Sequence, residues 1–532
     1  MDIYTPAFSR RRFLRTLGHG ALLAALPGQL LADEGHAVTI SLLHTTDLHG
    51  HILPTSDYAG HPDLGGLARC ATQLRQWRQA NPNSLLLDIG DIYQGTEVGF
   101  RSRGAAMVRC LNALNYDAWV VGNHEFDWGM VPFTESVQLS AMPVLTGNAL
   151  VEGKPVASLD PSVSPFSKLR PWLLKEIAGL RILIIALTTP ALSTWLPPEN
   201  LHGFEALDPI ESLRHLLREA KSLKPDAIVL AGHMGLVRKD DYANQVGALT
   251  REFPELAVFI GGHTHQNHSS EMVHNVLYTQ ADHYGIYAGK VDLTFDPITR
   301  KLLKREALTQ HMDSSIALDP LVLSLAKPDL DAADLVLTHL IGEVTETFNV
   351  ASSFGQPSDV ERLIGSAIRA ALRQKSCEID AVVHGLFDAT QPLQPGPKTV
   401  ADAWTILPYE NKIVTIELSR DDFLALARDL SSGTGRDVRN LMGVRVVGVV
   451  DANRLSVTDF QAVDGSPLPT KPLYRIALNS YDSQSAGQRF PVVGRLVARP
   501  SSHRVLHDID IRDALIDFFV SRQKVNRTSL LI

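Results

Sequence analysis

The sequence predicts an α/β fold in two domains, on three observations. Apolar runs of strand length alternate with stretches of helical periodicity over roughly the first 300 residues, as in a largely parallel sheet. Five of these runs end in residue types that ligate metal ions. The chain of 532 residues is too long for one hydrophobic core, and its residue pattern changes near residue 310.

The charge of the chain disfavours nucleic-acid polymers as partners. The first 32 residues hold four arginines and one aspartate, so the formal charge of −8 becomes −11 for the rest of the chain. No basic surplus is available to neutralise a phosphate backbone. Small anionic substrates stay possible if bound metal ions supply the positive charge.

Residues 1–32 have the pattern of an export signal. Ser9-Arg10-Arg11-Arg12-Phe13-Leu14-Arg15 resembles the twin-arginine signal and precedes a mild apolar stretch, 17–26, with cleavage expected near Ala32. The alternative is a basic amphipathic first helix. An exported, periplasmic protein that uses the twin-arginine translocation machinery is therefore expected, and because no later run reaches about 18 apolar residues, we expect no membrane span.

The cysteines do not form a metal-binding pattern. Cys70, Cys110 and Cys377 are three in number, and none lies in a CxxC spacing. At most one disulfide can form, and the helical, apolar surroundings of Cys70 and Cys110 favour buried free thiols. We therefore expect no zinc site built from thiolates.

The first two predicted strands each end in a carboxylate. The run 37–43 leads to Asp47 and His49, which lie two residues apart and so point to the same side of an extended segment. This pair suits a hard to borderline divalent ion. The predicted strand 84–91 ends in Gly90 and Asp91, and the two oxygens of Asp91 can bridge two ions. The helical stretch 66–80 between them predicts a right-handed crossover.

The third strand, 118–121, leads to the most distinctive hexapeptide, 122–127. Its glycine allows a sharp turn. Asn123 can ligate a metal through its carbonyl oxygen, whereas His124 can stay off the metal as a proton donor or a stabiliser of developing charge. Asp127 can hydrogen-bond one ring nitrogen of His124 and fix its tautomer.

Two further strands end in histidines. The run 226–231 leads to His233, after a strand at 180–187 and a helix at 209–222, and the run 257–262 leads to His263 and His265. Any single histidine can be a satisfied or surface residue. Together, these strand ends predict one metal site along one edge of an α/β sheet.

Five blocks in this order resemble the signature blocks of the calcineurin-like metallophosphoesterases. They are Asp47-x-His49, Gly90-Asp91, Gly122-Asn123-His124-Glu125, Gly232-His233 and Gly262-His263-Thr264-His265. The sequence around two of these blocks resembles the 5′-nucleotidase branch in particular, at His44 to Gly50 and at Gly122 to Asp127. This branch includes UDP-sugar hydrolases and 2′,3′-cyclic phosphodiesterases. The resemblance covers roughly residues 38–300.

The resemblance implies a four-layer αββα catalytic domain, here residues 33–310, with two divalent ions of Mn, Zn, Fe, Co or Mg. One ion would be held by Asp47, His49, Asp91 and His265, and the other by Asp91, Asn123, His233 and His263. His124 and Asp127 would form the catalytic dyad. We expect a metal-activated hydroxide that attacks phosphorus in line. The absence of a Gly-rich Walker loop argues against a nucleotide-driven motor or kinase.

The second half predicts a smaller α+β domain, 345–532, after a helical linker, 311–344. A helix is expected at 359–375. Strands are expected at 381–383, 412–418 and 442–450.

This half resembles the C-terminal substrate-binding domain of 5′-nucleotidases. The turn Leu407-Pro408-Tyr409-Glu410-Asn411 fits the family's proline-aromatic-x-asparagine turn, and the resemblance implies that Tyr409 and Tyr481 sandwich a base. Both rings can equally be core aromatics. The chain departs from the family where Asp388 replaces an arginine and where 484–490 replaces a Gly-Gly-Asp-Gly loop. Arg489 in that loop can take over part of the anion binding.

Three functions remain open on the sequence. The first is an exported metal-dependent phosphoric ester hydrolase, monomeric, that acts on small phosphoesters and above all on nucleotides. The second is a hydrolase of another ester on the same scaffold, such as a thiosulfohydrolase. The third is a non-catalytic protein that binds metal or ligand.

Overall fold

The computed structural model describes residues 37–532 apart from 161–164, 388–389 and 452–453. The predicted export signal and Asp388 therefore lie outside the described residues. Within the described part, no helix is both long enough and apolar enough to cross a membrane.

Seven strands form the first sheet, in the order β16-β15-β1-β2-β3-β4-β7. Five neighbouring strands of this sheet run parallel, namely β1, β2, β3, β4 and β7. β15 is antiparallel to both of its neighbours. The strands are β1 (Val38–Thr45), β2 (Ser84–Asp88), β3 (Ala118–Val120), β4 (Val144–Leu145), β7 (Leu169–Arg170), β15 (Tyr287–Phe295) and β16 (Leu302–His311). The last six residues of β1 are all buried, which explains a continuous apolar run in place of an alternation.

Six strands form the second sheet, in the order β13-β14-β12-β11-β9-β8. Its centre is parallel, and both edge strands are antiparallel. The strands are β8 (Trp172–Ile177), β9 (Leu180–Leu187), β11 (Ala227–Gly232), β12 (Val258–Gly261), β13 (Asn267–Val273) and β14 (Val276–Ala281). A small third sheet joins β5 (Ala149–Val151), β6 (Lys154–Pro155) and β10 (Phe204–Ala206).

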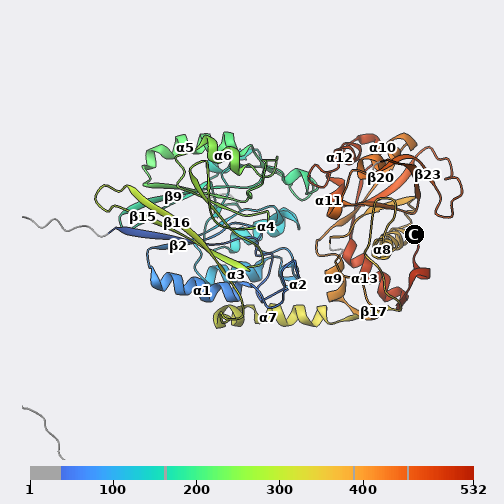
Figure 1. The fold of residues 1–532 in the computed structure, drawn as a ribbon, viewed down its shortest axis with the longest axis horizontal. Helices are drawn as coiled ribbons and strands as arrows, with labels where there is room; N and C mark the ends of the chain where they lie inside the picture. Colours follow the sequence, from blue (N-terminus) through green and yellow to red (C-terminus); the bar gives the residue numbers. More distant parts are fainter. Residues whose placement is uncertain (1–36, 161–164, 388–389, 452–453) are drawn as a thin grey trace, which may run out of the picture.

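The two large sheets pack face to face. Side chains from both, such as Leu42 and Leu87 of the first and Ile184 and Val229 of the second, form one buried core. Helices cover the two outer faces (Figure 1). They are α1 (Leu67–Ala80), α2 (Glu97–Ser102), α3 (Ala105–Ala113) and α4 (Met130–Leu139) on one side, and α5 (Pro209–Ala220) and α6 (Val246–Glu252) on the other. The four-layer αββα arrangement and the helices predicted at 66–80 and 209–222 are confirmed.

One long helix, α7 (Pro320–Leu337), runs from the first half of the chain towards the second (Figure 1). Asp319 caps its N-terminus by accepting hydrogen bonds from the N–H groups of Leu321 and Val322, and it also pairs with Arg75 of α1. The stretch expected to be a linker also contains β17 (Leu340–Val344), which pairs with strands of the second half.

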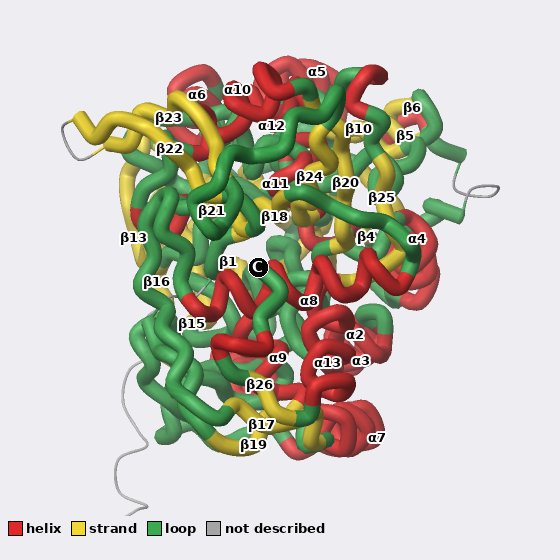
Figure 2. The backbone as a smooth tube through the Cα atoms, turned by 90° about the vertical axis from the view of Figure 1, so that its right-hand side faces the viewer, coloured by secondary structure: helices red, strands yellow, loops and turns green. Residues whose placement is uncertain are grey.

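The second half is built on a five-stranded sheet with a core on each face, in the order β21-β18-β24-β20-β25. Figure 2 shows α8, α9 and α13 below this sheet and α10 and α12 above it. The strands are β18 (Ala381–His384), β20 (Lys412–Leu418), β21 (Asn440–Met442), β24 (Tyr474–Asn479) and β25 (Val505–Asp510). The helices are α8 (Asp359–Gln374), α9 (Val400–Ile406), α10 (Arg420–Leu430), α11 (Ser480–Ser483), α12 (Pro491–Val497) and α13 (Ile511–Arg522).

The helix predicted at 359–375 is confirmed, but the single strand predicted at 442–450 is wrong. That run divides into β21 and β22 (Arg445–Asp451), which pairs with β23 (Arg454–Gln461) in a separate hairpin. Gly443 lies at the break with φ 92°, a conformation that only glycine adopts easily. The remaining small sheet joins β17 to β19 (Gly396–Thr399) and β26 (Lys524–Val525).

Candidate metal centre

The predicted ligands follow the carboxyl ends of five parallel strands, and these strands belong to two sheets. β1, β2 and β3 of the first sheet lead to Asp47, His49, Asp91 and Asn123, whereas β11 and β12 of the second lead to His233, His263 and His265. The expectation of one edge of one sheet is therefore wrong. The ligands still meet because the two sheets pack together with these strand ends at the same end of the sandwich.

Asp47, His49 and His265 form the first group of potential ligands. Their nearest ligand atoms all lie within 4.8 Å of one another. The Nε2 atoms of His49 and His265 are 3.0 Å apart, and His265 Nε2 lies 3.5 Å from Asp47 Oδ1. Two imidazole nitrogens and a carboxylate therefore point at one position.

Asp91, His233 and His263 form the second group, again with ligand atoms within 4.8 Å of one another. His233 Nε2 lies 3.0 Å from Asp91 Oδ2. Asn123 Oδ1 lies 2.9 Å from His263 Nδ1, so the amide oxygen of this predicted ligand lies beside the group.

Asp91 lies between the two groups. Its Oδ2 is 3.0 Å from His233 Nε2 and 3.8 Å from His49 Nε2, whereas its Oδ1 accepts a hydrogen bond of 2.8 Å from the backbone N–H of His124. One carboxylate is thus placed to contact an ion in each group.

Outer hydrogen bonds orient three of the histidines. The Nδ1 atom of His49 lies 2.8 Å from the carbonyl oxygen of Gln94, and that of His233 lies 2.7 Å from the carbonyl oxygen of Ile89. His265 Nδ1 lies 2.6 Å from the hydroxyl of Tyr58. With Nδ1–H donating to an oxygen, Nε2 is left with a lone pair for a metal ion. No sequence signal pointed to Tyr58, which lies on a loop without a motif.

Five of the seven proposed ligands have a left-handed backbone conformation. Residues other than glycine rarely adopt a positive φ, and such strain gathers at functional sites. The residues are Asp47 (50°), His49 (47°), Asp91 (56°), His263 (75°) and His265 (52°).

The donor set fits a pair of divalent cations. It combines carboxylate and amide oxygens with imidazole nitrogens, which suit ions such as Mn²⁺, Zn²⁺ and Fe²⁺. His233 Nε2 is fully buried and faces the Asp91 carboxylate at 3.0 Å. Burial lowers the pKa of His233, but the carboxylates of Asp91 and Asp47 outweigh it and raise this pKa to about 10. The buried acids thus attract positive charge.

His124 stands beside the ligand groups and belongs to neither. Its ring lies 5.1 Å from that of His49, and its Nδ1 lies 2.6 Å from Asp127 Oδ2. Burial lowers the pKa of His124, but Asp127 and Asp91 outweigh it and raise this pKa to about 10. The raised pKa favours the protonated ring, which can donate a proton.

Glu125 is a further residue of the site whose role the sequence did not reveal. Its buried carboxylate accepts hydrogen bonds from the backbone N–H groups of Asp91 at 3.0 Å, Ile92 at 2.8 Å and Gly122 at 2.6 Å. It therefore ties the turn after β2 to the turn after β3.

Aromatic side chains surround the centre, and some come from the second half of the chain. The Tyr409 ring lies nearly parallel to His124, with ring centroids 5.8 Å apart, and Phe387 lies 5.0 Å from Tyr409. Trp195 of the first half packs against His263 at 4.9 Å. Phe387 and Trp195 were not predicted.

Tyr481 and Arg489 lie next to each other, with Arg489 Nη1 3.1 Å from the Tyr481 hydroxyl. Arg489 also pairs with Asp437 at 3.2 Å, which offsets part of its charge. Asn411 accepts a hydrogen bond from the backbone N–H of Tyr481 at 3.1 Å and so joins the Tyr409 turn to this segment.

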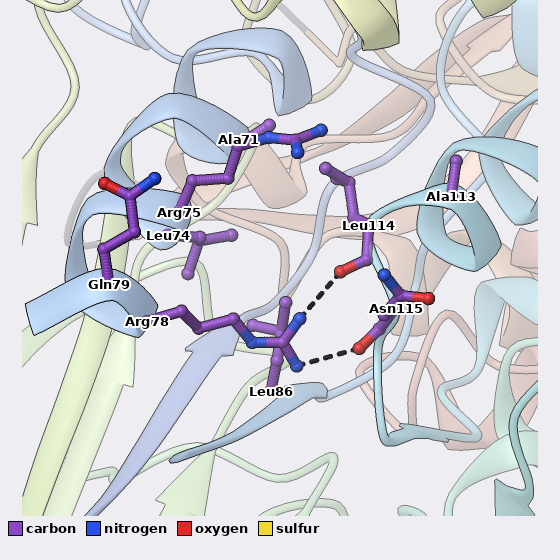
Figure 3. Close-up of a pocket in the computed structure, with 9 residues that line it drawn as sticks. All are labelled: Ala71, Leu74, Arg75, Arg78, Gln79, Leu86, Ala113, Leu114 and Asn115. Atoms are coloured by element: carbon purple, nitrogen blue, oxygen red, sulfur yellow. Dashed lines mark hydrogen bonds between the residues drawn. The ribbon is translucent and has the colours of Figure 1, made fainter. Parts of the chain in front are cut away.

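Two cavities lie outside the ligand groups. One, of about 240 Å³, lies between α1 and the end of α3. Figure 3 shows Arg78 reaching across it to the carbonyl oxygens of Leu114 and Asn115, at 2.9 and 2.8 Å. Another, of about 350 Å³, lies between residues 193–194 and 483–495, where the backbone N–H of Gly487 donates to Thr194 across the two halves. None of the proposed ligands lines either cavity.

Sequence comparisons match each half to a described family. Residues 40–267 match the calcineurin-like phosphoesterases, and residues 340–495 match the 5′-nucleotidase C-terminal domain. The chain is 30% identical over 347 residues to the 5′-nucleotidase of Bos taurus, which covers 59% of this chain and 55% of that protein. It is 24% identical over 491 residues to the endonuclease YhcR of Bacillus subtilis, covering 88% of this chain and 39% of that protein. The chain thus spans about half the length, or less, of these relatives.

The fold has a counterpart among solved structures. The 5′-nucleotidase precursor of Thermus thermophilus superposes with a TM-score of 0.68 at 22% identity, over 92% of this chain and 97% of that one. The two matched domains occur in this order, and the first of them contains both ligand groups. The chain therefore belongs to the calcineurin-like phosphoesterases that carry a 5′-nucleotidase C-terminal domain.

Proposed function

We propose that the chain is an exported phosphohydrolase that uses two divalent metal ions to cleave phosphoester bonds, with nucleotides as its substrates. The observation that carries this proposal is the pair of adjacent ligand groups joined by Asp91. Two-ion sites of this kind serve in-line displacement at phosphorus.

The ions would be held by Asp47, His49, His265 and Asp91 on one side, and by Asp91, Asn123, His233 and His263 on the other. When bound, they lower the pKa of a water molecule and offset charge on the phosphoryl oxygens. Asp91 joins the two groups, since its Oδ2 approaches His49 of one group and His233 of the other. Glu125 fixes the backbone at Asp91 and Gly122 and so holds the turns after β2 and β3 together.

His124 acts as proton donor or as the partner of developing negative charge. Asp127 accepts from Nδ1–H and leaves Nε2–H to face the reacting group. The protonated state that Asp127 and Asp91 favour suits donation to a leaving alkoxide.

The substrate proposal rests on the second half of the chain. Tyr409 lies beside His124 and offers a flat surface to a nucleobase, with Tyr481 and Arg489 further along the same domain. An aromatic pair contributes about 0.5–1.5 kcal/mol beyond area burial. Stacking on these rings would therefore favour a nucleotide over the same phosphoester without a base.

The decisive experiment compares two substrates that both release a 5′-hydroxyl of ribose from phosphate, one with a base and one without. Mn²⁺-loaded protein is assayed with AMP and ribose 5-phosphate, and with UDP-glucose, 2′,3′-cyclic AMP, a sulfate ester and single-stranded DNA as further arms. We expect phosphate release from AMP with a higher kcat/KM than from ribose 5-phosphate. Tyr409→Ala and Tyr481→Ala should each lower this ratio about 2- to 12-fold.

Three outcomes would contradict parts of the proposal. Equal kcat/KM for AMP and ribose 5-phosphate would remove nucleotides as the substrate class. Cleavage of the sulfate ester alone would favour the alternative hydrolase, and no turnover with two ions bound would favour a binding protein. The DNA arm is included because a relative of this chain is named an endonuclease.

Export is the remaining part of the proposal, and it is supported by the arginine pattern near the N-terminus. Replacing Arg10 and Arg11 with lysine keeps the charge and removes the paired arginines. The double variant should stay in the cytoplasm of a bacterium with twin-arginine translocation, whereas the parent chain reaches the periplasm. If the parent chain and the double variant are found in the same cell fraction, export by twin-arginine translocation is contradicted.

A further inference from the structure

A chain of buried polar contacts connects the metal centre to the second half of the protein through Gln94. Gln94 is fully buried and lies three residues after Asp91. Its carbonyl oxygen lies 2.8 Å from His49 Nδ1. Its side-chain amide donates a hydrogen bond of 2.9 Å to Glu410 Oε2, which belongs to the other domain. One residue thus contacts a proposed ligand and the opposite domain.

Glu410 continues the chain of contacts. Its Oε1 accepts a hydrogen bond of 3.0 Å from Arg512 Nη2, and the two side chains are only 6% and 4% exposed. Arg512 Nε also donates to the carbonyl oxygen of Leu407 at 2.8 Å. Residues 407–410 are therefore held at both ends by one guanidinium.

A second contact crosses the domain boundary at the same place. The Arg512 guanidinium lies 3.3 Å from the centre of the Trp404 ring, and Trp404 Nε1 donates to Glu97 Oε2 at 2.8 Å. Glu97 begins α2 of the catalytic domain. Arg512 is thus fixed from two directions, and it is a rigid support for the 407–410 turn.

This turn carries Tyr409, whose ring faces His124. Glu410 and Arg512 fix the turn only within their own domain, because both belong to it. Gln94 makes the one hydrogen bond from the catalytic domain to the Glu410 carboxylate among the contacts described. A hydrogen bond to a carboxylate is stronger than one between neutral groups. Gln94 therefore ties the turn directly to the segment that follows Asp91, whereas the Trp404–Glu97 contact reaches the turn only through Arg512.

We propose that Gln94 is a positioning residue that holds Tyr409 in register with the metal centre and thereby sets the preference for substrates whose leaving group carries a base. This inference rests on the proposed function, since it concerns the nucleotide preference of the same site. Gln94 acts through Glu410 and Tyr409 and does not itself touch the substrate.

The test uses Gln94→Met in the full-length protein. Methionine has a similar length but no amide, and the backbone carbonyl that meets His49 remains. The buried Glu410–Arg512 pair also stays intact, so folding is preserved. The matched control is Glu199→Ala, which removes a different contact between the domains, Glu199 to Arg504 at 2.6 Å, away from the turn.

The first readout is the ratio of kcat/KM for AMP to that for ribose 5-phosphate. We expect Gln94→Met to lower it about 2- to 12-fold, to the level of Tyr409→Ala, as stacking on one ring allows. The double variant should lose no more than Tyr409→Ala alone, because both changes remove the same contact. Glu199→Ala should leave the ratio unchanged. A lower ratio with Tyr409→Ala and an unchanged one with Gln94→Met would overturn the proposal.

The second readout does not depend on turnover. Amide hydrogen exchange is measured on peptides that span 403–414, and Gln94→Met should raise exchange there relative to Glu199→Ala. Unchanged exchange would overturn the positioning role whatever the substrate. Raised exchange with no effect of Tyr409→Ala on the ratio would support the positioning role and contradict the base contact in the proposed function.

Discussion

The left-handed backbone at Asp47, His49, Asp91, His263 and His265 places strain in the ligands themselves. Such conformations cost of the order of 1–2 kcal/mol per residue other than glycine. Each occurs in the turn after a strand, where the chain must fold back to point a side chain at its neighbours. The buried core between the two sheets holds the strands that lead into these turns.

Asp91→Asn tests the bridge between the two ligand groups. The change removes the negative charge that both ions would share, so we expect weaker binding at both sites and near-complete loss of turnover. Calorimetric titration with Mn²⁺ measures the affinities. A titration identical to that of the parent chain would show that another carboxylate joins the two ions.

His124→Ala tests whether His124 is a proton donor or a metal ligand. If His124 donates a proton or stabilises charge, kcat should fall by about two to four orders of magnitude with both ions still bound. Elemental analysis of the purified variant counts the ions per chain. Loss of one ion would identify His124 as a ligand.

At the scale of elements, the start of α13 combines a helix cap with a half-buried acid. Asp510 accepts a hydrogen bond of 2.9 Å from the backbone N–H of Arg512. Burial raises the pKa of Asp510 from 3.8 to about 7; Arg512 opposes this rise and Glu410 adds to it. The cap therefore carries a carboxyl group that resists ionisation.

Asp510→Asn keeps the cap and removes the ionisation. Because the folded-state pKa lies above the unfolded one, Asp510 favours folding most below pH 4, and this contribution is lost as the pH rises through about 7. A pKa change from 3.8 to about 7 is equivalent to about 4 kcal/mol. The variant should be more stable than the parent at pH 8 by up to this amount.

Denaturant unfolding at pH 4 and pH 8 measures the difference. The two proteins should have nearly equal stability at pH 4, since asparagine and a protonated aspartate cap the helix alike. A variant that is less stable at pH 8 would show that Asp510 is ionised there and that its charge supports Arg512.

At the scale of the whole molecule, the two halves have separate hydrophobic cores. The clusters of the first half contain only residues up to Ala333, and those of the second begin at Ile341. Every proposed metal ligand belongs to the first half. Metal binding and the folding of the second half are therefore coupled only through the domain interface.

Removal of the metal ions with a chelator should separate the unfolding transitions of the two halves in a thermal scan. A metal ion that binds only the folded state, at a free concentration of 100 times its dissociation constant, adds about 2.7 kcal/mol to the free energy of unfolding. We expect a calorimetric transition assigned to the first half to move to lower temperature in EDTA, while the transition of the second half moves little. A single transition that shifts as a whole would show that the interface couples both domains.

The sequence by itself determined most of the predicted elements and the candidate metal ligands. Continuous apolar runs predict buried strands because β1, β9 and β11 are covered on both faces, and the turns after β1 and β11 carry ligands. These signals are local, since burial on two faces and turn chemistry leave their mark on neighbouring residues. The break at Gly443 was missed because the apolar run continues across it.

Only the tertiary structure decided which surfaces meet. It divided the ligand strands between two sheets, placed the Tyr58 hydroxyl beside His265, and joined Gln94 to Glu410 across the domains. The last two contacts connect residues more than 200 positions apart. No periodicity in the sequence encodes them, because they arise when separately formed faces pack against each other and the buried polar groups must find partners.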